Sequence, residues 1–270
     1  MVHANLPDCL IKAPPNLTLE TVCSVKHWND NLFSFNITRP ASFRFRSGEF
    51  VMIGIASEGA PLLRPYSIAS PSYSDELEFL SIYVPNGPLT SRLRAIAPGD
   101  KIFLGKKATG TLVTDALLEG ERLFLLSSGT GLAPFLSIAR DPDIYSRFNQ
   151  IILIHCVRQI KDLAFRQNLE SSFADDYLVR DQALLQLLYI PTVTREKFKT
   201  NGRITDLLNN KSIFCTINGL NKLNYMTDRV MICGGKQMII DISSTLTRNG
   251  FTEGSNSRPG HFVIEKAFIE

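Results

Sequence analysis

The first part of the chain contains short runs in which apolar and polar residues alternate. Phe33, Phe35 and Ile37 alternate with polar residues, and this period of two is typical of a half-buried β-strand. Turn residues such as Ser47-Gly48 separate the runs. The pattern predicts six short strands and therefore an antiparallel β-barrel, with strands at Thr18–His27, 33–38, Glu49–Ile55, Leu62–Ala69, Glu76–Val84 and Asp100–Leu104.

The second part of the chain has longer apolar runs without alternation, separated by helical patterns. Strands are expected at Arg122–Ser127, Gln150–Val157, Leu187–Thr194, Asp228–Cys233 and His261–Ile269, and helices at Phe135–Ala139, Ala164–Phe173 and Lys236–Leu246. Strands that are apolar on both faces and alternate with helices indicate a parallel sheet covered by helices. The sequence thus predicts two domains, a barrel over residues 1–118 and an α/β domain over residues 119–270.

Composition excludes several classes of protein. The chain has 270 residues, 44% hydrophobic and 20% charged, which is typical of a globular protein. Its net charge of +3 comes without a dense Lys/Arg cluster, so no nucleic-acid partner is expected. Five cysteines without a C-x-x-C pair argue against a disulfide framework, a metal site or an iron–sulfur cluster. No secretory signal or membrane-length apolar run is visible, so we expect a cytoplasmic protein with no membrane contact. No coiled-coil seam or spare apolar element appears in the sequence, so a monomer is expected.

Arg64-Pro65-Tyr66-Ser67 places a cation, an aromatic ring and a hydroxyl on one predicted strand. Alternation puts Arg64 and Tyr66 on one face and Ser67 on the other. A guanidinium binds phosphate in a fork geometry, and an aromatic ring can stack on a flat ring system. The alternative is an ordinary edge strand with a surface arginine and a half-buried tyrosine.

The segment Asn86–Leu93 interrupts the strands with Gly87, Leu89, Thr90 and Ser91. It predicts a loop that leads into a short helix ending near Pro98-Gly99, whose first N–H groups could bind phosphate. An ordinary capped helix that plugs the end of the barrel is the alternative. The next segment, Lys106–Val113, is expected to be an exposed turn with a short strand.

A glycine turn and three arginines follow the strands of the second part. Gly129-Thr130-Gly131 joins a buried strand to a helix, as in the opening of a dinucleotide-binding unit. Arg158, Arg195 and Arg203 lie just past predicted strand ends, where open α/β sheets bind ligands. A cation here favours the 2′-phosphate of NADP, whereas NAD is read by an acidic residue. Scattered surface arginines are the alternative.

In this order and spacing, the motifs resemble a known family. The chain resembles the bacterial-type ferredoxin/flavodoxin–NADP(+) reductases from about Leu17 to its end, and the motifs are Arg64-Pro-Tyr-Ser67, Gly87-Pro-Leu-Thr-Ser91, Gly129-Thr-Gly-Leu-Ala-Pro134, Val157-Arg158-Gln159, Pro191-Thr-Val-Thr-Arg195, Gly202-Arg203, Cys233-Gly234 and Glu265-Lys-Ala-Phe268. The resemblance implies an FAD-binding barrel followed by an NADP(H)-binding α/β domain.

The resemblance also implies roles for individual residues. Catalytic roles would fall to Ser67 near the reactive flavin nitrogen, Cys233 beside the nicotinamide and Glu265 near the flavin edge. Cofactor contacts would come from Arg64, Pro65, Tyr66, Ser67, Gly87, Leu89, Thr90, Ser91, Thr130, Gly131, Arg158, Arg195, Arg203, Ala267 and Phe268. Ala267 takes the place of the terminal aromatic residue of the plastid reductases, so Phe268 is implied to stack on FAD instead. Lys236 stands where many relatives have proline.

Without the resemblance, a cysteine such as Cys233 at the end of a buried strand is usually a packed core thiol, and the alternative for Glu265 is a charge at the sheet edge. With it, the expected function is an FAD-dependent reductase that moves electrons between NADPH and a one-electron carrier, ferredoxin or flavodoxin. The alternatives are the flavin reductase component of an oxygenase or dehydrogenase chain, and a non-catalytic flavin- or nucleotide-binding redox sensor.

Overall fold

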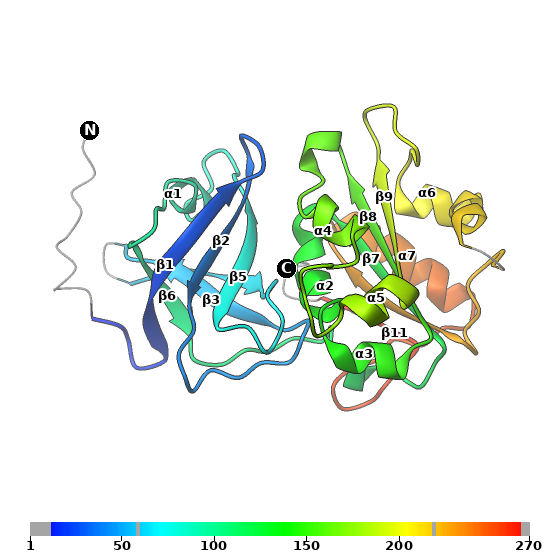
Figure 1. Ribbon diagram of the computed structural model, residues 1–270, viewed down its shortest axis with the longest axis horizontal. Coiled ribbons are helices and arrows are strands. Elements are labelled where there is room, and N and C mark those ends of the chain that lie inside the picture. The colour runs from blue at the N-terminus through cyan, green and yellow to red at the C-terminus, as the bar shows by residue number, and fades with distance from the viewer. Residues whose placement is uncertain (1–11, 58–59, 218–219, 266–270) are drawn as a thin grey trace.

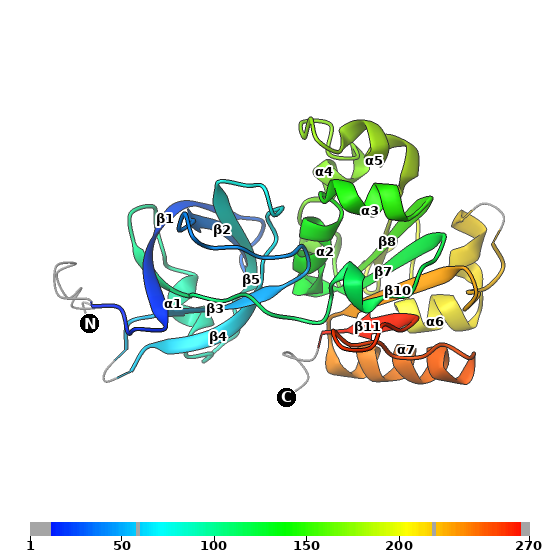
Figure 2. The same ribbon diagram turned by 90° about the horizontal axis from the view of Figure 1, so that it is seen from below.

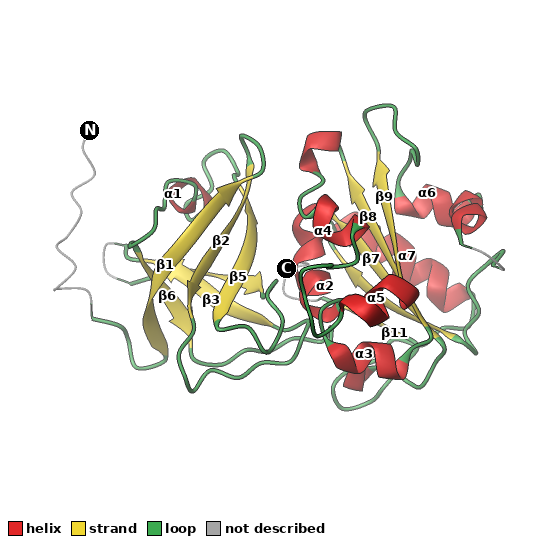
Figure 3. Cartoon of the chain, in the orientation of Figure 1, coloured by secondary structure: helices red, strands yellow, loops and turns green. Residues whose placement is uncertain are grey.

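Two β-sheets lie side by side along the long axis of the molecule (Figure 1). The computed structural model describes residues 12–57, 60–217 and 220–265. The first sheet is antiparallel and the second is parallel. Most helices gather around the second sheet, whereas the first half is built mainly of strands and loops (Figure 3).

The first sheet has six strands in the order β4-β3-β6-β1-β2-β5. They are β1 Leu17–His27, β2 Leu32–Thr38, β3 Phe50–Ile55, β4 Leu62–Ser67, β5 Glu76–Ile82 and β6 Lys101–Gly105. A bridge between Ile68 and Phe79 brings the two outer strands together, so the sheet curls into the predicted barrel. Phe33, Phe35 and Ile37 point into its buried core, as the alternation predicts.

Two predictions for the first half are wrong. The short helix α1 spans Thr90–Leu93 and ends well before Pro98-Gly99. The segment 106–113 is not an exposed turn, because Ala108, Leu112 and Val113 are buried. It carries no named strand, only a bridge from Thr109 to Phe50. Leu112 and Val113 pack into the apolar cluster of the second half, which explains their burial.

The second sheet is parallel, with the order β11-β10-β7-β8-β9. Its strands are β7 Arg122–Ser128, β8 Gln150–Val157, β9 Leu187–Val193, β10 Asp228–Cys233 and β11 Phe262–Ile264. Short helical turns are η2 Thr114–Ala116, η3 Gly129–Leu132, η4 Ile160–Asp162 and η5 Ser212–Thr216. The helices are α2 Ala133–Ile138, α3 Pro142–Arg147, α4 Arg166–Glu170, α5 Arg180–Gln186, α6 Ile204–Asn209 and α7 Lys236–Arg248.

Helices α2 to α5 cover one face of this sheet, and α6 and α7 cover the other (Figure 2). Each face has its own apolar cluster, and neighbouring residues of one strand, such as Leu125 and Leu126, point into different clusters. This explains the continuous apolar runs of the sequence, since both faces of every central strand are buried.

The helix predicted over Ala164–Phe173 is shorter than expected. Helix α4 covers only Arg166–Glu170, because Phe165, Ser172 and Phe173 have positive φ angles. The final strand is also shorter within the described residues, since β11 ends at Ile264 and Glu265 is outside it. None of the helices in the described part of the chain is long and apolar enough to cross a membrane.

The two halves share a packed interface. Asn29, in the turn between β1 and β2, donates to Asp162 of η4 at 3.0 Å. The rings of Trp28 and Phe165 lie with their centroids 4.6 Å apart. Leu32, Ala69 and Leu80 of the barrel are among the buried residues in the same apolar cluster as helix α2.

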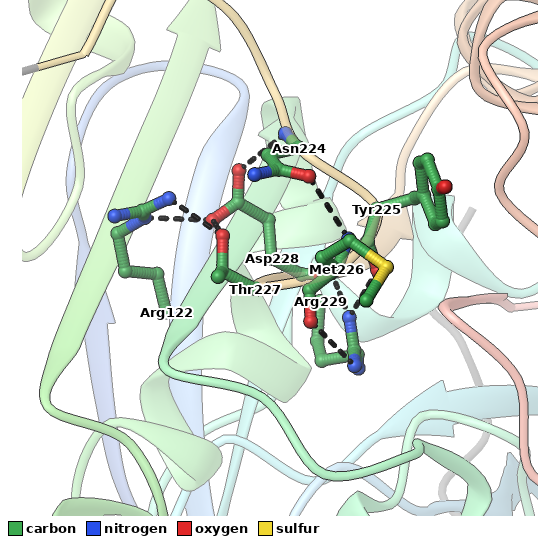
Figure 4. Close-up of polar contacts among 7 residues, drawn as sticks. All are labelled: Arg122, Asn224, Tyr225, Met226, Thr227, Asp228 and Arg229. Atoms are coloured by element: carbon green, nitrogen blue, oxygen red, sulfur yellow. Dashed lines mark hydrogen bonds and ion pairs between the residues drawn. The ribbon is translucent and has the colours of Figure 1, made fainter.

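A polar cluster holds the amino ends of β7 and β10 (Figure 4). Asp228 is fully buried and accepts from Arg122 Nε at 2.7 Å and from the Asn224 backbone N–H at 2.7 Å. The buried Arg229 donates to the carbonyls of Leu118 and Tyr225. This cluster lies at the opposite sheet edge from the carboxyl ends of the strands, where ligands bind in such folds, so it serves as a structural anchor.

Candidate active site

Strand β4 carries Arg64-Pro65-Tyr66-Ser67 at the edge of the barrel. Ile53 of β3 lies opposite Arg64, and Val51 lies opposite Tyr66. Directly opposite residues share a face of a sheet, so Arg64 and Tyr66 lie on one face and Ser67 on the other. The prediction from alternation is confirmed, and Pro65 does not change it.

The three side chains differ in exposure. Arg64 is exposed, and its guanidinium donates to the backbone carbonyl of Leu63 at 2.7 Å. The Tyr66 hydroxyl lies 3.0 Å from Ser81 Oγ, and burial raises the pKa of this tyrosine, so it stays neutral. Ser67 is 6% exposed, and its buried hydroxyl has no hydrogen-bond partner among the described residues. A buried hydroxyl without a partner is costly. A polar atom of a bound ligand could provide that partner.

The loop before α1 is held by its own side chains. Thr90 Oγ1 accepts from the Val84 backbone N–H at 3.2 Å, and Ser91 Oγ donates to the Gly87 carbonyl at 2.7 Å. A Cβ on Gly87 would lie 2.4 Å from Thr90 Oγ1, so only glycine fits. Leu89 is buried in the barrel core. The hydroxyls therefore shape this loop in addition to any contact with a ligand.

Two glycine turns interlock at the carboxyl ends of β7 and β10. Ser128 Oγ accepts from the Gly235 backbone N–H at 3.0 Å. A Cβ on Gly131 would lie 2.3 Å from the carbonyl oxygen of Cys233, so this turn packs directly on the neighbouring backbone. The sequence predicted the turn at Gly129–Gly131 but missed Ser128 and Gly235. Ser128 is the last residue of β7 and Gly235 lies two positions after β10, and this place at the strand ends was the available signal.

Cys233 and Glu265 lie at the ends of neighbouring strands, β10 and β11. Both are almost fully buried, at 2% and 1% exposure. Burial and then the Glu265 carboxylate raise the pKa of the Cys233 thiol, so it stays protonated and is no thiolate nucleophile. A Cβ on Gly110 would lie 3.4 Å from Glu265 Oε2, which places the carboxylate against the segment that leaves the barrel.

The three arginines lie in segments that follow the carboxyl ends of β8 and β9. The Arg195 backbone N–H donates to the Arg158 carbonyl at 3.0 Å, so pairing continues past the strand ends. Arg203 precedes helix α6, after Gly202 pairs back to Val193. All three arginines are exposed. Within residues 12–57, 60–217 and 220–265, no carboxylate forms a salt bridge with any of them.

These features fit the two nucleotides that the sequence predicts. The unpartnered Ser67 hydroxyl and the exposed Arg64 suit a flavin nucleotide. The three exposed arginines and the glycine turn suit NADP(H). Ala267 and Phe268 lie outside the described residues.

Comparisons with known proteins agree with this arrangement. The model of the oxidoreductase FAD-binding domain matches residues 16–111, and that of the oxidoreductase NAD-binding domain matches residues 125–244. Ferredoxin–NADP reductase A of Sorangium cellulosum is 48% identical over 94% of this chain and 91% of its own length. Flavodoxin/ferredoxin–NADP reductase of Rhodobacter capsulatus is 48% identical, with 93% of each chain covered.

A solved structure is similar along the whole chain. It is a ferredoxin–NADP(+) reductase from Neisseria gonorrhoeae with bound FAD and NADP, 32% identical, with a TM-score of 0.85 over 94% of this chain and 100% of that one. A barrel that is followed by a parallel-sheet nucleotide domain is thus shared with a protein that binds both cofactors. The chain belongs to the ferredoxin/flavodoxin–NADP reductase family.

Proposed function

We propose that this protein is an FAD-dependent reductase that moves electrons between NADPH and a one-electron carrier, ferredoxin or flavodoxin. The observation that carries the proposal is the group of three exposed arginines at one sheet edge, which have no carboxylate partner among the described residues. Relatives named ferredoxin–NADP and flavodoxin/ferredoxin–NADP reductases support it at 47–48% identity. When FAD is bound, two electrons arrive as a hydride from NADPH and leave one at a time.

The barrel would hold FAD through β4. Arg64 is free to bind a phosphate in a fork geometry, and the Tyr66 ring is fixed by edge contacts with Phe35 and Phe79, which preorganise it as a flavin platform. The Ser67 hydroxyl would find its partner on the flavin. Pro65 restricts the strand, and the loop residues Gly87, Leu89, Thr90 and Ser91 would shape the phosphate site.

The second domain would hold NADP(H) at the carboxyl edge of its sheet. The turn at Thr130 and Gly131 would border the pyrophosphate, and Arg158, Arg195 and Arg203 would bind the 2′-phosphate. Cys233, a neutral thiol, and Glu265 would border the site of hydride transfer and exclude water from it. Ala267 and Phe268 would complete the FAD site.

We also propose a domain boundary, an oligomeric state and a cellular location. The domain boundary lies at residues 118/119, between the last strand of the barrel and the first strand of the parallel sheet. The enzyme acts as a monomer, because no coiled-coil seam or spare apolar element is apparent in the sequence. It acts in the cytoplasm, where reduced cysteines are the rule.

An anaerobic visible spectrum of the FAD-loaded protein tests the proposal. We expect NADPH to bleach the flavin quickly and NADH slowly. Equal bleaching by both would contradict the role of the arginines, and failure to retain FAD would contradict the role of Arg64–Ser67. Reduction without electron delivery to either purified carrier would favour a redox sensor.

Arg203→Ala tests the 2′-phosphate site directly. The KM for NADPH should rise about tenfold or more, because a charge-assisted hydrogen bond contributes about 1.5–3 kcal/mol. The KM for NADH should change little. Arg180→Ala, which removes an exposed arginine on α5, is the matched control. Equal effects on both nucleotides would exclude this role for Arg203.

A further inference from the structure

We propose that Thr192 is a positioning residue that sets the preference for NADPH over NADH by fixing the backbone from which Arg203 projects. The inference rests on the proposed role of Arg203. Thr192 is fully buried near the end of β9, so it would not touch the nucleotide itself.

Two side chains from neighbouring strands reach one carbonyl, that of Gly202. Thr192 Oγ1 donates to it at 2.7 Å, a favourable distance for an O–H···O hydrogen bond. Cys156 of β8, which lies opposite Thr192 in the parallel pairing, has its sulfur 3.8 Å from the same oxygen. Gly202 directly precedes Arg203, so this carbonyl belongs to the peptide that leads into the arginine.

The return of the chain from β9 to Gly202 is tightly bonded. The Gly202 backbone N–H donates to the Val193 carbonyl at 3.1 Å, and Val193 in turn donates to the Thr200 carbonyl at 3.1 Å. Gly202 has a φ of +129°, a conformation that other residues rarely adopt. The chain therefore turns at Gly202 in a conformation that glycine allows, and Thr192 holds the Gly202 carbonyl from within the sheet.

Arg203 is fixed on its other side by helix α6. Its carbonyl accepts from the Leu207 backbone N–H at 3.0 Å, at the first turn of the helix. The Gly202–Arg203 peptide is thus clamped between the Thr192 hydroxyl and α6. Arg203 is exposed, and the direction of its side chain depends on that peptide.

Removal of the Thr192 hydroxyl would leave the Gly202 carbonyl without its strong donor. The peptide could then turn toward another partner, and the Arg203 guanidinium would be held in the right place for a smaller fraction of the time. Positioning of this kind affects only the ligand that Arg203 contacts, the 2′-phosphate. NADH lacks that phosphate and should bind as before.

The test compares Thr192→Val, which keeps the shape but removes the hydroxyl, with Thr192→Ser, which retains it. The probes are 2′-AMP, measured by calorimetry on the full-length FAD-loaded protein, and the KM values of NADPH and NADH. For Thr192→Val we expect about fivefold weaker 2′-AMP binding and a matching rise in the KM for NADPH, the order of a lost hydrogen bond. The kcat and the KM for NADH should stay unchanged, and Thr192→Ser should restore binding.

Thr216→Val is the matched control, because it removes a hydroxyl that donates to a backbone carbonyl, that of Ile213, at 2.6 Å. Gly202→Ala provides a second variant, since its φ is unfavourable for alanine while the nearest side-chain atom, on Leu207, is 3.4 Å away. Gly202→Ala should likewise raise the KM for NADPH and leave the KM for NADH unchanged.

Equal changes for NADPH and NADH, or a lower Tm with unchanged 2′-AMP binding, would overturn the inference and make Thr192 purely structural. Arg203→Ala distinguishes the positioning role of Thr192 from the proposed 2′-phosphate role of Arg203. If that variant weakens 2′-AMP binding and Thr192→Val does not, only the positioning role fails. If Arg203→Ala leaves 2′-AMP binding unchanged, the proposed role of Arg203 fails and the inference fails with it.

Discussion

The buried His155 should make the protein less stable as the pH falls. It is 1% exposed and lies beneath the glycine turn, with Nε2 3.3 Å from the Gly129 carbonyl and Nδ1 3.3 Å from the Tyr189 hydroxyl. A neutral imidazole satisfies both contacts, donating from Nε2 and accepting at Nδ1. Burial lowers the pKa of His155 from 6.5 to about 4, although the Gly129 carbonyl opposes this shift.

The sign of the effect follows from proton binding. Between pH 4 and 6.5 the unfolded chain binds a proton at this histidine and the native protein does not. The contribution of His155 to the free energy of unfolding is therefore complete above pH 6.5 and is lost as the pH falls. From pH 7 to pH 5 the pH passes about 1.5 units below the unfolded pKa, which corresponds to a loss of about 2 kcal/mol.

Urea unfolding of wild type and His155→Gln at both pH values, with equal excess FAD, measures this contribution. The glutamine amide can still donate to the Gly129 carbonyl but does not titrate. The wild type should lose about 2 kcal/mol more than the variant between pH 7 and pH 5. The exposed His27 supplies the control variant His27→Gln, which should follow the wild type. The same pH dependence in His155→Gln and wild type would refute the argument.

Three other changes should have separate signatures. Tyr66→Ala should release FAD on gel filtration, whereas Tyr66→Phe should keep it because the ring contacts remain; retention by the alanine variant would remove Tyr66 from the flavin site. Cys233→Ala should slow flavin reduction by NADPH in stopped flow without loss of FAD, with Cys23→Ala as control, and an unchanged rate would leave Cys233 as core packing. Asp228→Asn should lower the free energy of unfolding by about 3 kcal/mol, because it leaves the Arg122 charge without its partner; a change below about 1 kcal/mol would show that the cluster is dispensable.

Several elements could be predicted from the sequence because their burial follows a simple rule. Strands β8 and β10 have the predicted bounds, since both faces of a central parallel strand are covered and most of their residues are apolar. The arginines could be placed near one another for a similar reason, because the carboxyl ends of parallel strands share a sheet edge. The helix predicted over Ala164–Phe173 was too long, because the positive φ angles at its ends follow from packing and not from propensity.

The two sheets, their order along the chain and the residue types of each nucleotide site could be read from the residues alone, because hydrophobic period and motif spacing are local properties. Only the tertiary structure decided which carbonyl each buried hydroxyl meets. Thr192 reaches Gly202 because the chain turns back from β9, and Ser128 meets Gly235 because β10 pairs with β7, strands about a hundred residues apart. Such contacts depend on strand order and on the return path of loops, and neither is recorded in the residues of one segment.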